Sequence, residues 1–335
     1  MHEAMLWEPL EDNKVHCFLC RHNCRINDGR RGICHVRENV GGRLYSLVYD
    51  RIIARNVDPI EKKPLFHFLP GSYSYSIATP GCNFRCLFCQ NADIAQMPRD
   101  SKIIMGQPAL PQDIVADAEG TGCKSIAYTY TEPTIFFELA YDTALIAHER
   151  GLKNVFVTNG YITKEALAKI RPVLDAANID LKGFNPEFYR KVCGSELEKV
   201  LDSIRAYHES GIWIELTTLV IPDYNDNPEE LRGIARFIAS LDKNIPWHVT
   251  RFHPTYKLTD KPITPLETLT AARRIGIEEG LNYVYEGNVP GSGGENTICP
   301  SCGDTLIKRY GNMTLADKTV NGSCASCGEK IAGVF

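Results

Sequence analysis

Apolar runs alternate with amphipathic stretches through the middle of this chain, and this alternation constrains the fold more than any other feature. The runs are rich in β-branched and aromatic residues, as strands are, and cover residues 73–79, 125–129, 154–158, 178–181, 213–220 and 247–252. Helical patterns lie at residues 111–119, 134–150, 163–174, 196–210, 228–241 and 265–279. The alternation predicts the α/β class with a parallel sheet. Six strands are too few for a closed eight-stranded barrel, so we expect a partial (β/α)6 barrel of the TIM type, with a doubly wound sheet as the alternative.

The two ends of the chain differ from this middle region in composition. Residues 1–66 are rich in cysteine and polar residues, and short strands are expected at 44–49 and 52–57, joined at Asp50-Arg51. A glycine-rich linker at 287–296 precedes a cysteine-dense tail. We therefore expect an N-terminal Cys-rich metal-binding module at 1–66, a core domain at 67–290 and a C-terminal metal-binding module at 291–335.

Charge and hydropathy exclude several classes of function. The formal net charge of −4 gives no general affinity for the backbone of nucleic acids. No apolar run approaches the length of a membrane span, and the first residues lack the pattern of a signal peptide. We expect a cytoplasmic protein that does not bind membranes and has no general affinity for nucleic acid.

Thirteen cysteines are many for 335 residues, and without a secretion signal a disulfide framework is not expected. Eleven of them fall into three tight groups, whose spacing is typical of metal ligands because a short loop can turn several sulfurs toward one site. The groups are Cys17, Cys20, Cys24 and Cys34; Cys82, Cys86 and Cys89; and Cys299, Cys302, Cys324 and Cys327. The isolated Cys123 and Cys193 are expected to be small buried residues.

The central group, Cys82-x3-Cys86-x2-Cys89, directly follows the first predicted strand. Three thiolates suit an iron–sulfur cubane that leaves one iron open, whereas a structural zinc site normally takes four protein ligands. An open iron can chelate a small molecule, as catalytic metals do. The alternative is a three-cysteine zinc site completed by a distant histidine.

This stretch, with Phe88 just before the third cysteine, resembles the signature of the radical S-adenosylmethionine (SAM) superfamily. The resemblance implies that the three cysteines hold a [4Fe-4S] cluster and that SAM binds its open iron. It further implies that one electron cleaves SAM to a 5′-deoxyadenosyl radical, which abstracts hydrogen from a substrate, with the cofactor supplying the chemistry.

Four later segments resemble the activating enzymes of glycyl-radical enzymes, such as pyruvate formate-lyase activase. They lie at the ends of predicted strands three to six, at 157–161 (VTNGY), 180–182 (DLK), 219–226 (LVIPDYND) and 251–254 (RFHP). A Glu-Pro pair after the second strand also matches. The resemblance implies a SAM pocket that includes Glu132, Asn159, Asp180, Lys182 and His253. The sequence departs from the family at Thr129-Tyr130-Thr131, where glycines are usual, and at Val157, where the activases have aspartate.

The flanking cysteine groups predict two further metal sites. Two Cys-x2-Cys-Gly knuckles near the C-terminus predict a four-thiolate zinc ribbon, with iron as the less favoured metal. The four N-terminal thiols, with His16, His22 and His35 nearby, suit either zinc or a second iron–sulfur cluster, and unmetallated thiols are the third alternative.

Taken over nearly the full chain, the N-terminal cysteines, the central motif, KPLFHFLPG at 63–71 and the tail resemble the radical SAM enzymes of the AmmeMemoRadiSam system, which are pyruvate formate-lyase activating enzyme-like. The resemblance implies Memo-like and AMMECR-like companions and an electron donor such as flavodoxin or ferredoxin.

Three functions are compatible with these motifs to different degrees. The first is an activase that abstracts hydrogen from a protein substrate. The second is a radical SAM oxidoreductase that modifies a small molecule, peptide or RNA directly. The third is a non-catalytic metal-binding module, against which the three-thiol site argues.

Overall fold

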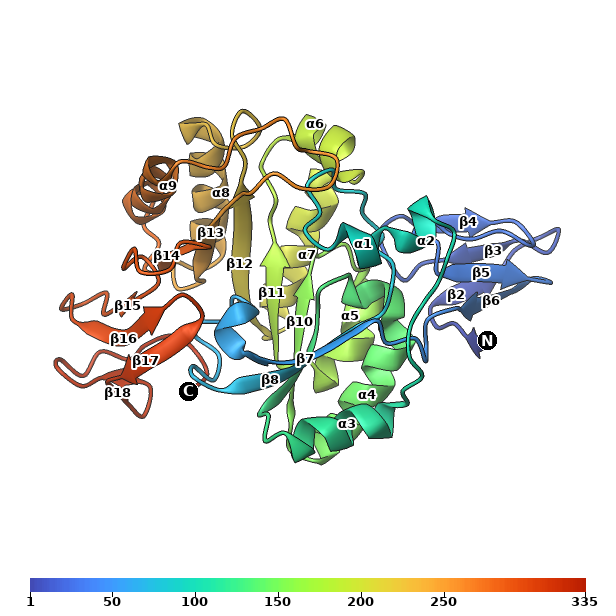
Figure 1. The fold of residues 1–335 in the computed structure, drawn as a ribbon, viewed down its shortest axis with the longest axis horizontal. Coiled ribbons are helices and arrows are strands. Elements are labelled where there is room, and N and C mark those ends of the chain that lie inside the picture. Colours follow the sequence, from blue (N-terminus) through green and yellow to red (C-terminus); the bar gives the residue numbers. More distant parts are fainter.

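The computed structural model describes all 335 residues, and an eight-stranded sheet runs through its centre (Figure 1). Six of its parallel strands agree with the predicted strands to within two residues. They are β8 (Tyr73–Ala78), β9 (Ser125–Tyr128), β10 (Lys153–Thr158), β11 (Ala176–Asp180), β12 (Trp213–Val220) and β13 (Trp247–Arg251). Each pairs with the next in parallel. The α/β class is therefore confirmed.

The two edge strands of this sheet were not predicted as part of it. β14 (Val284–Gly287) pairs in parallel with β13, and β7 (Ala54–Pro59) pairs antiparallel with β8. Strands are present near both segments predicted at 44–49 and 52–57, but the two strands belong to different sheets. The earlier segment, β6 (Arg43–Ser46), pairs with N-terminal strands, whereas β7 covers the edge of β8. β7 and β14 do not pair with each other, so the sheet stays open.

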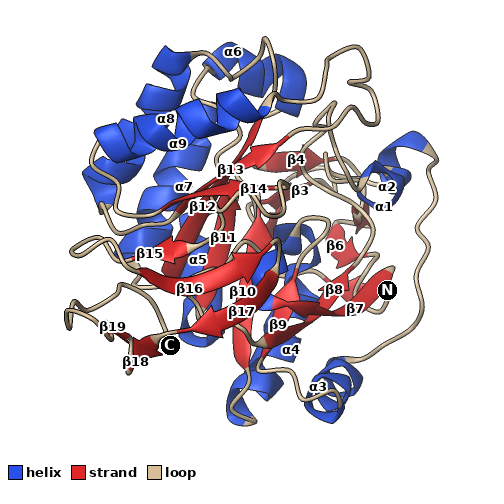
Figure 2. Ribbon diagram, turned by 60° about the vertical axis from the view of Figure 1, so that its left-hand side comes forward, coloured by secondary structure: helices blue, strands red, loops and turns tan.

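Helices follow the strands as the sequence predicts. They are α3 (Pro111–Gly120), α4 (Phe137–Glu149), α5 (Lys164–Ile170), α7 (Leu197–Glu209), α8 (Pro228–Leu241) and α9 (Leu266–Glu278). Capping side chains begin two of them, since Thr163 accepts a hydrogen bond from Ala166 N and Asn227 accepts one from Glu230 N. Figure 2 shows α8 and α9 together beside one end of the sheet and α3 and α4 beside the other. None of the helices combines the length and apolar character needed to cross a membrane.

The N-terminal region forms two small antiparallel sheets. One contains β1 (His2–Glu3), β6 and β5 (Arg37–Val40); the other contains β2 (Trp7–Pro9), β3 (Val15–Cys17) and β4 (Cys24–Ile26). Its apolar residues, such as Val15 and Ile26, belong to the same cluster of 69 buried residues as the central sheet. A buried ion pair between Arg37 and Glu138 of α4 also joins the two parts. The N-terminal region is thus packed into the main core.

The C-terminal region lies at the opposite side of the central sheet from the N-terminal strands (Figure 1). Its apolar residues share a smaller core with Phe66, Tyr283 and Tyr285. Its strands are β15 (Thr297–Ile298), β16 (Thr305–Tyr310), β17 (Met313–Asp317), β18 (Thr319–Val320) and β19 (Ser323–Cys324). The buried guanidinium of Arg309 donates to the Phe66 carbonyl at 2.9 Å, and Thr314 donates to Glu61 at 2.7 Å. These bonds attach the region to the chain segment that leads from β7 into β8.

A buried carboxylate fixes that segment to the sheet. Glu215 of β12 accepts hydrogen bonds from Phe66 N at 3.0 Å, His67 N at 2.7 Å and His248 Nε2 at 2.7 Å. Burial alone would raise the pKa of Glu215, but the hydrogen bond from His248 holds it below its ordinary value. The segment is therefore held against the sheet by a charged acceptor rather than by apolar contact alone.

Candidate active site

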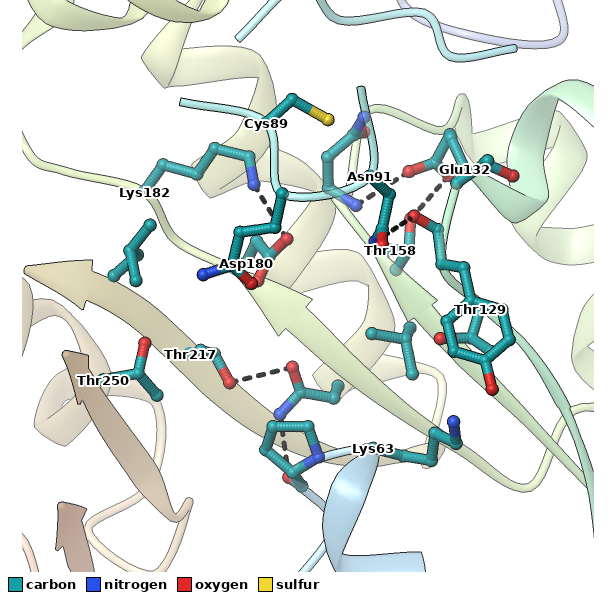
Figure 3. Close-up of a pocket in the computed structure, with 18 of the residues that line it drawn as sticks. Lys63, Cys89, Asn91, Thr129, Glu132, Thr158, Asp180, Lys182, Thr217 and Thr250 are labelled. Carbon is teal, nitrogen blue, oxygen red and sulfur yellow. Dashed lines mark hydrogen bonds and ion pairs between the residues drawn. The ribbon is translucent and has the colours of Figure 1, made fainter. Parts of the chain in front are cut away.

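The loop after β8 brings the three central cysteines to one cavity of about 540 Å³. Figure 3 shows this cavity with Cys89, the third of them. Cys82, Cys86 and Cys89 all line this cavity, and no fourth cysteine does. Thr129, Thr158 and Asp180 also line it, and they lie at the carboxyl ends of β9, β10 and β11 or just beyond. In an open parallel sheet this edge is where ligands bind.

Backbone hydrogen bonds hold the cysteine loop in place. Arg85 N donates to Cys193 O at 2.9 Å, and Leu87 N donates to Val192 O at 3.0 Å. Phe84 N donates to Cys82 Sγ at 3.3 Å, the type of contact that supports a thiolate bound to metal. The loop therefore rests on the segment Tyr189–Cys193 and presents its sulfurs on the cavity side.

Cys193 is a residue whose position the sequence did not indicate. Its thiol is fully buried, and its contact with Cys86, together with burial, raises the pKa of the Cys86 thiol well above its ordinary value. Cys193 does not line the cavity. It lies far from the motif in sequence, so only the fold reveals the contact.

Burial also affects the other two thiols of the loop. It raises the pKa of Cys82 well above its ordinary value, with the Glu132 carboxylate as a second cause. It raises the pKa of Cys89 to about 11. The free thiols are therefore protonated near neutral pH, and a bound metal must displace their protons.

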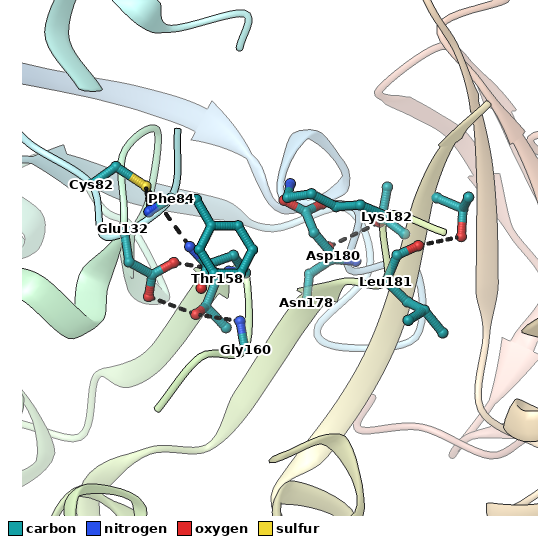
Figure 4. Close-up of polar contacts among 12 residues, drawn as sticks. Cys82, Phe84, Glu132, Thr158, Gly160, Asn178, Asp180, Leu181 and Lys182 are labelled. Atoms are coloured by element: carbon teal, nitrogen blue, oxygen red, sulfur yellow. Dashed lines mark hydrogen bonds and ion pairs between the residues drawn. The ribbon is translucent and has the colours of Figure 1, made fainter. Parts of the chain in front are cut away.

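Glu132 lines the cavity, and its carboxylate joins two loops (Figure 4). Its oxygens accept hydrogen bonds from Thr134 Oγ1 at 2.6 Å, Thr158 Oγ1 at 2.7 Å and Asn159 N at 2.8 Å. Burial raises the pKa of Glu132, although these donors act in the opposite direction. Its oxygens already accept hydrogen bonds from groups of the protein. Glu132 therefore holds the chain segments that follow β9 and β10 in position.

Asn159 lies against the cysteine loop. Its Nδ2 donates to Asn83 Oδ1 at 2.8 Å and lies 3.8 Å from Cys82 Sγ. Asn159 therefore fixes the direction of the loop at the first cysteine, and it also lines the cavity.

Asp180 and Lys182 line the cavity near Cys89 and form an ion pair of 2.8 Å (Figure 3). Burial would lower the pKa of Lys182, but Asp180 raises it well above its ordinary value. Lys182 is therefore a cation at neutral pH and can face an anionic group of a ligand.

His253 is the one predicted pocket residue that the structure does not bring to the cavity. It lies beyond the end of β13, is exposed and is absent from the cavity lining. The histidine that lines the cavity is His248, five residues earlier within β13. The motif match predicted the end of this strand correctly, but the two residues after the buried Phe252 are exposed and lie outside the cavity.

The end of the cavity opposite Cys89 contains Lys63 and Tyr130, which were not among the predicted residues of the SAM pocket. Lys63 is 1 % exposed, pairs with Asp58 at 2.6 Å and lies over the ring of Tyr130 (Figure 3). Burial lowers the pKa of Lys63 to about 8. Tyr130 has a φ of 60°, in the left-handed region that favours glycine, at the position where glycines are usual in the family.

Comparison with known proteins agrees with this geometry. The family described as the radical SAM superfamily matches residues 76–238, a span that begins within β8 and includes the three cysteines and β9 to β12. The chain belongs to the radical SAM superfamily. It is 52 % identical over 334 residues to an uncharacterized protein of Methanocaldococcus jannaschii, with 99 % of each chain covered.

More distant relatives of this radical SAM protein have assigned activities. A pyruvate formate-lyase-activating enzyme of Staphylococcus aureus is 22 % identical over 238 residues, covering 64 % of this chain and 90 % of the other. Among solved structures, Streptococcus suis SuiB bound to precursor peptide SuiA has a TM-score of 0.51 at 17 % identity, covering 68 % of this chain and 51 % of that one. The latter likeness shows the shared fold.

Membership of the superfamily implies a [4Fe-4S] cluster and SAM, and the residues of the cavity fit both. Three cysteines line one cavity, a backbone N–H supports Cys82, and a half-buried cation lies beside Cys89. These are the donors that a cluster and a carboxylate-bearing ligand require.

The C-terminal cysteines form a second candidate metal site. All four sulfurs lie within 4.8 Å of one another, and the pairs Cys299–Cys327 and Cys302–Cys324 are each 3.7 Å apart. The predicted metal-binding group is therefore assembled in the fold. The four N-terminal cysteines line a separate small cavity with Leu19, Ile26 and Ile135.

Proposed function

We propose that this chain cleaves SAM reductively at a [4Fe-4S] cluster held by Cys82, Cys86 and Cys89. The resulting 5′-deoxyadenosyl radical would abstract a hydrogen atom from a substrate bound in the same cavity. The observation that carries the proposal is the arrangement of three thiols on one cavity that no fourth cysteine lines. When bound, the cluster supplies the electron and the open iron.

The residues around the thiols would bind and orient SAM. Lys182 would face its carboxylate, since this cation lies beside Cys89 and is paired on one side by Asp180. Asp180 keeps an acceptor oxygen for a hydroxyl of the ribose. Asn159 and Glu132 would hold the neighbouring loop ends in place, so that SAM meets a preformed wall.

The substrate would occupy the end of the cavity near Lys63 and Tyr130. An activase acting on a protein, as the likeness to pyruvate formate-lyase activase suggests, is the first candidate. Direct modification of a smaller substrate is the second, and one observation favours it. Asn312, from the C-terminal region, and Phe66 line the same cavity as the cysteines, which narrows the space for a protein segment.

The remaining parts of the chain are assigned by the same reasoning. We propose zinc in the C-terminal group, because a Zn–S length of about 2.3 Å places tetrahedral sulfurs about 3.8 Å apart. The N-terminal group would hold zinc or a second iron–sulfur cluster. The open sheet would form a partial barrel in the core domain at 67–290, flanked by modules at 1–66 and 291–335.

The proposed partners of the chain are an electron donor such as flavodoxin or ferredoxin, and Memo-like and AMMECR-like companions.

The test is anaerobic incubation of the reduced protein with SAM, followed by measurement of 5′-deoxyadenosine. Cys86→Ala should abolish its formation, whereas Cys123→Ala, a buried cysteine away from the cavity, should keep it. To separate the two candidate substrates, a glycyl-radical signal is sought by electron paramagnetic resonance (EPR) in a partner enzyme. Its appearance would favour the activase.

A further inference from the structure

The four N-terminal cysteines come from two neighbouring turns and form one group. Cys17 and Cys24 face each other across β3 and β4, Cys20 lies in the turn between them, and Cys34 precedes β5. All four line one small cavity, so that residues distant by up to 17 positions in the sequence share one space. The arrangement is that of one metal site with four thiol ligands.

The spacing of the sulfurs differs among the three cysteine groups of this chain. The C-terminal sulfurs all lie within 4.8 Å of one another, as one zinc ion requires. No three of the N-terminal sulfurs do, and neither do those of Cys82, Cys86 and Cys89. A cubane spreads its thiolates roughly 6 Å apart, because each binds a different iron. The N-terminal group, like the cluster loop, therefore lacks the close sulfur spacing of the C-terminal group.

The surroundings of the N-terminal group also suit an iron–sulfur cluster. Its cavity is lined by apolar side chains such as Leu19 and Ile26. Arg37, which is buried, donates to Cys17 Sγ at 3.2 Å. An N–H donor to sulfur in an apolar pocket stabilises a reduced, more negative cluster.

This group lies directly against the loop of the SAM-binding cluster. His22, two residues after Cys20, bonds through Nε2 to Asn83 O at 2.8 Å, and Asn83 is adjacent to Cys82. Gly81, the residue before Cys82, also packs closely against this region. A Cβ atom at position 81 would lie 2.7 Å from Val36 Cγ1 and 3.5 Å from Ile135 Cδ1, and Ile135 lines the N-terminal cavity. Figure 1 shows the N-terminal strands beside α1 (Ala92–Ala95) and α2 (Met97–Asp100), which follow the cluster loop.

We propose that Cys17, Cys20, Cys24 and Cys34 hold a second [4Fe-4S] cluster that passes one electron to the cluster at Cys82, Cys86 and Cys89. A low-potential one-electron carrier of the flavodoxin or ferredoxin class reduces the second cluster. That cluster is reoxidised as the first is reduced, and no bond or proton is exchanged. The path runs from Cys20 through His22 and its hydrogen bond to Asn83 and Cys82. The metal assignment stands by itself, whereas the electron transfer rests on the proposed function.

Metal analysis of the anaerobically purified full chain tests the first half. We expect about eight irons, about eight sulfides and about one zinc per chain. About four irons and two zincs would overturn the assignment. The triple variant Cys82→Ala/Cys86→Ala/Cys89→Ala should keep about four irons and give, when reduced, an EPR signal that SAM does not change. A triple variant that folds but holds no iron would contradict the proposal.

Rates of deoxyadenosine formation test the electron transfer. In Cys20→Ser/Cys34→Ser, the rate with flavodoxin as donor should fall at least tenfold, while titanium(III) citrate should still support turnover. The variant His22→Phe, which keeps all cysteines, should also be slower with flavodoxin only. Equal rates of these variants and the native chain with flavodoxin would contradict the relay. Loss of activity with titanium(III) in the native chain would instead contradict the proposed function.

Discussion

Lys182 Nζ lies 2.8 Å from Asp180 Oδ2, and both residues face the cavity beside Cys89. The pair comes from the end of β11, so the sheet itself fixes its position relative to the cysteine loop. A cation held in this way is ready to receive a carboxylate without a change of rotamer.

The first prediction concerns this cation. Lys182→Met should weaken SAM binding by about tenfold or more, because loss of one charge-assisted hydrogen bond costs about 1.5–3 kcal/mol. Anaerobic titration calorimetry of the oxidised protein measures the affinity for SAM. The exposed Lys191→Met, which removes a surface ion pair with Glu187, is the matched control. Equal affinity of the two variants would exclude a role for Lys182 in binding SAM.

A second prediction concerns Glu132, whose carboxylate accepts bonds from Thr134, Thr158 and Asn159. An amide in its place leaves at least one buried donor unpaired, at a cost of about 1–3 kcal/mol. Glu132→Gln should therefore lower both the free energy of unfolding and the affinity for SAM. Denaturant titration and calorimetry check the two effects. Glu119→Gln, on the exposed face of α3, should change neither. Unchanged SAM affinity in a destabilised Glu132→Gln would limit its role to folding.

The C-terminal cysteines give a third prediction. Cys302→Ser should remove about one zinc per chain and leave the iron content unchanged, because this thiol belongs to the four-sulfur group. Hydrogen exchange should rise in residues 297–324, which pack around this group. A variant that loses iron but keeps zinc would reverse the assignment of metals.

The fourth prediction is a dependence of stability on pH at the joint between the C-terminal region and the sheet. His67 bonds to Ala332 O at 2.7 Å and to Tyr285 OH at 2.6 Å, and burial lowers its pKa to about 4. Between pH 6.5 and 4 the unfolded chain binds a proton at this histidine and the folded chain does not. Stability should therefore fall as the pH drops, by about 2 kcal/mol from pH 7 to pH 5.

Denaturant midpoints at pH 7 and pH 5 measure this loss. His67→Gln, whose amide can also form two hydrogen bonds, should be less sensitive to pH than the native chain. An equal pH dependence in both proteins would show that other groups control it.

The sequence predicted the strands and helices of the sheet well, because each is a long segment with one periodicity. It missed the edge strand β14, which is short and has β13 as its partner. It predicted a strand at 52–57, where β7 lies, but not the pairing of β7 with β8. The strand predicted at 44–49 is present as β6, but its partners β1 and β5 were not predicted, since pairing partners are set by tertiary contacts.

In the candidate site, too, local motifs were predicted and contacts between distant segments were not. The spacing of Cys82, Cys86 and Cys89 is a local signal, and the structure brings all three to one cavity. Contacts between segments that are distant in the sequence could not be predicted. Examples are the contact of Cys193 with Cys86 and the position of Lys63 at the end of the cavity opposite the thiols. The resemblance placed His253 at the cavity by a match of motif, whereas the direction of the chain after β13 places His248 there.

Formation of 5′-deoxyadenosine from SAM by the reduced protein is the decisive measurement for cluster-dependent cleavage. The native chain and Cys123→Ala should form it, whereas Cys82→Ala, Cys86→Ala and Cys89→Ala should not. Cleavage of SAM by a protein that lacks these thiols, or no cleavage by a native chain whose cluster is fully loaded and reduced, would contradict cleavage at this cluster.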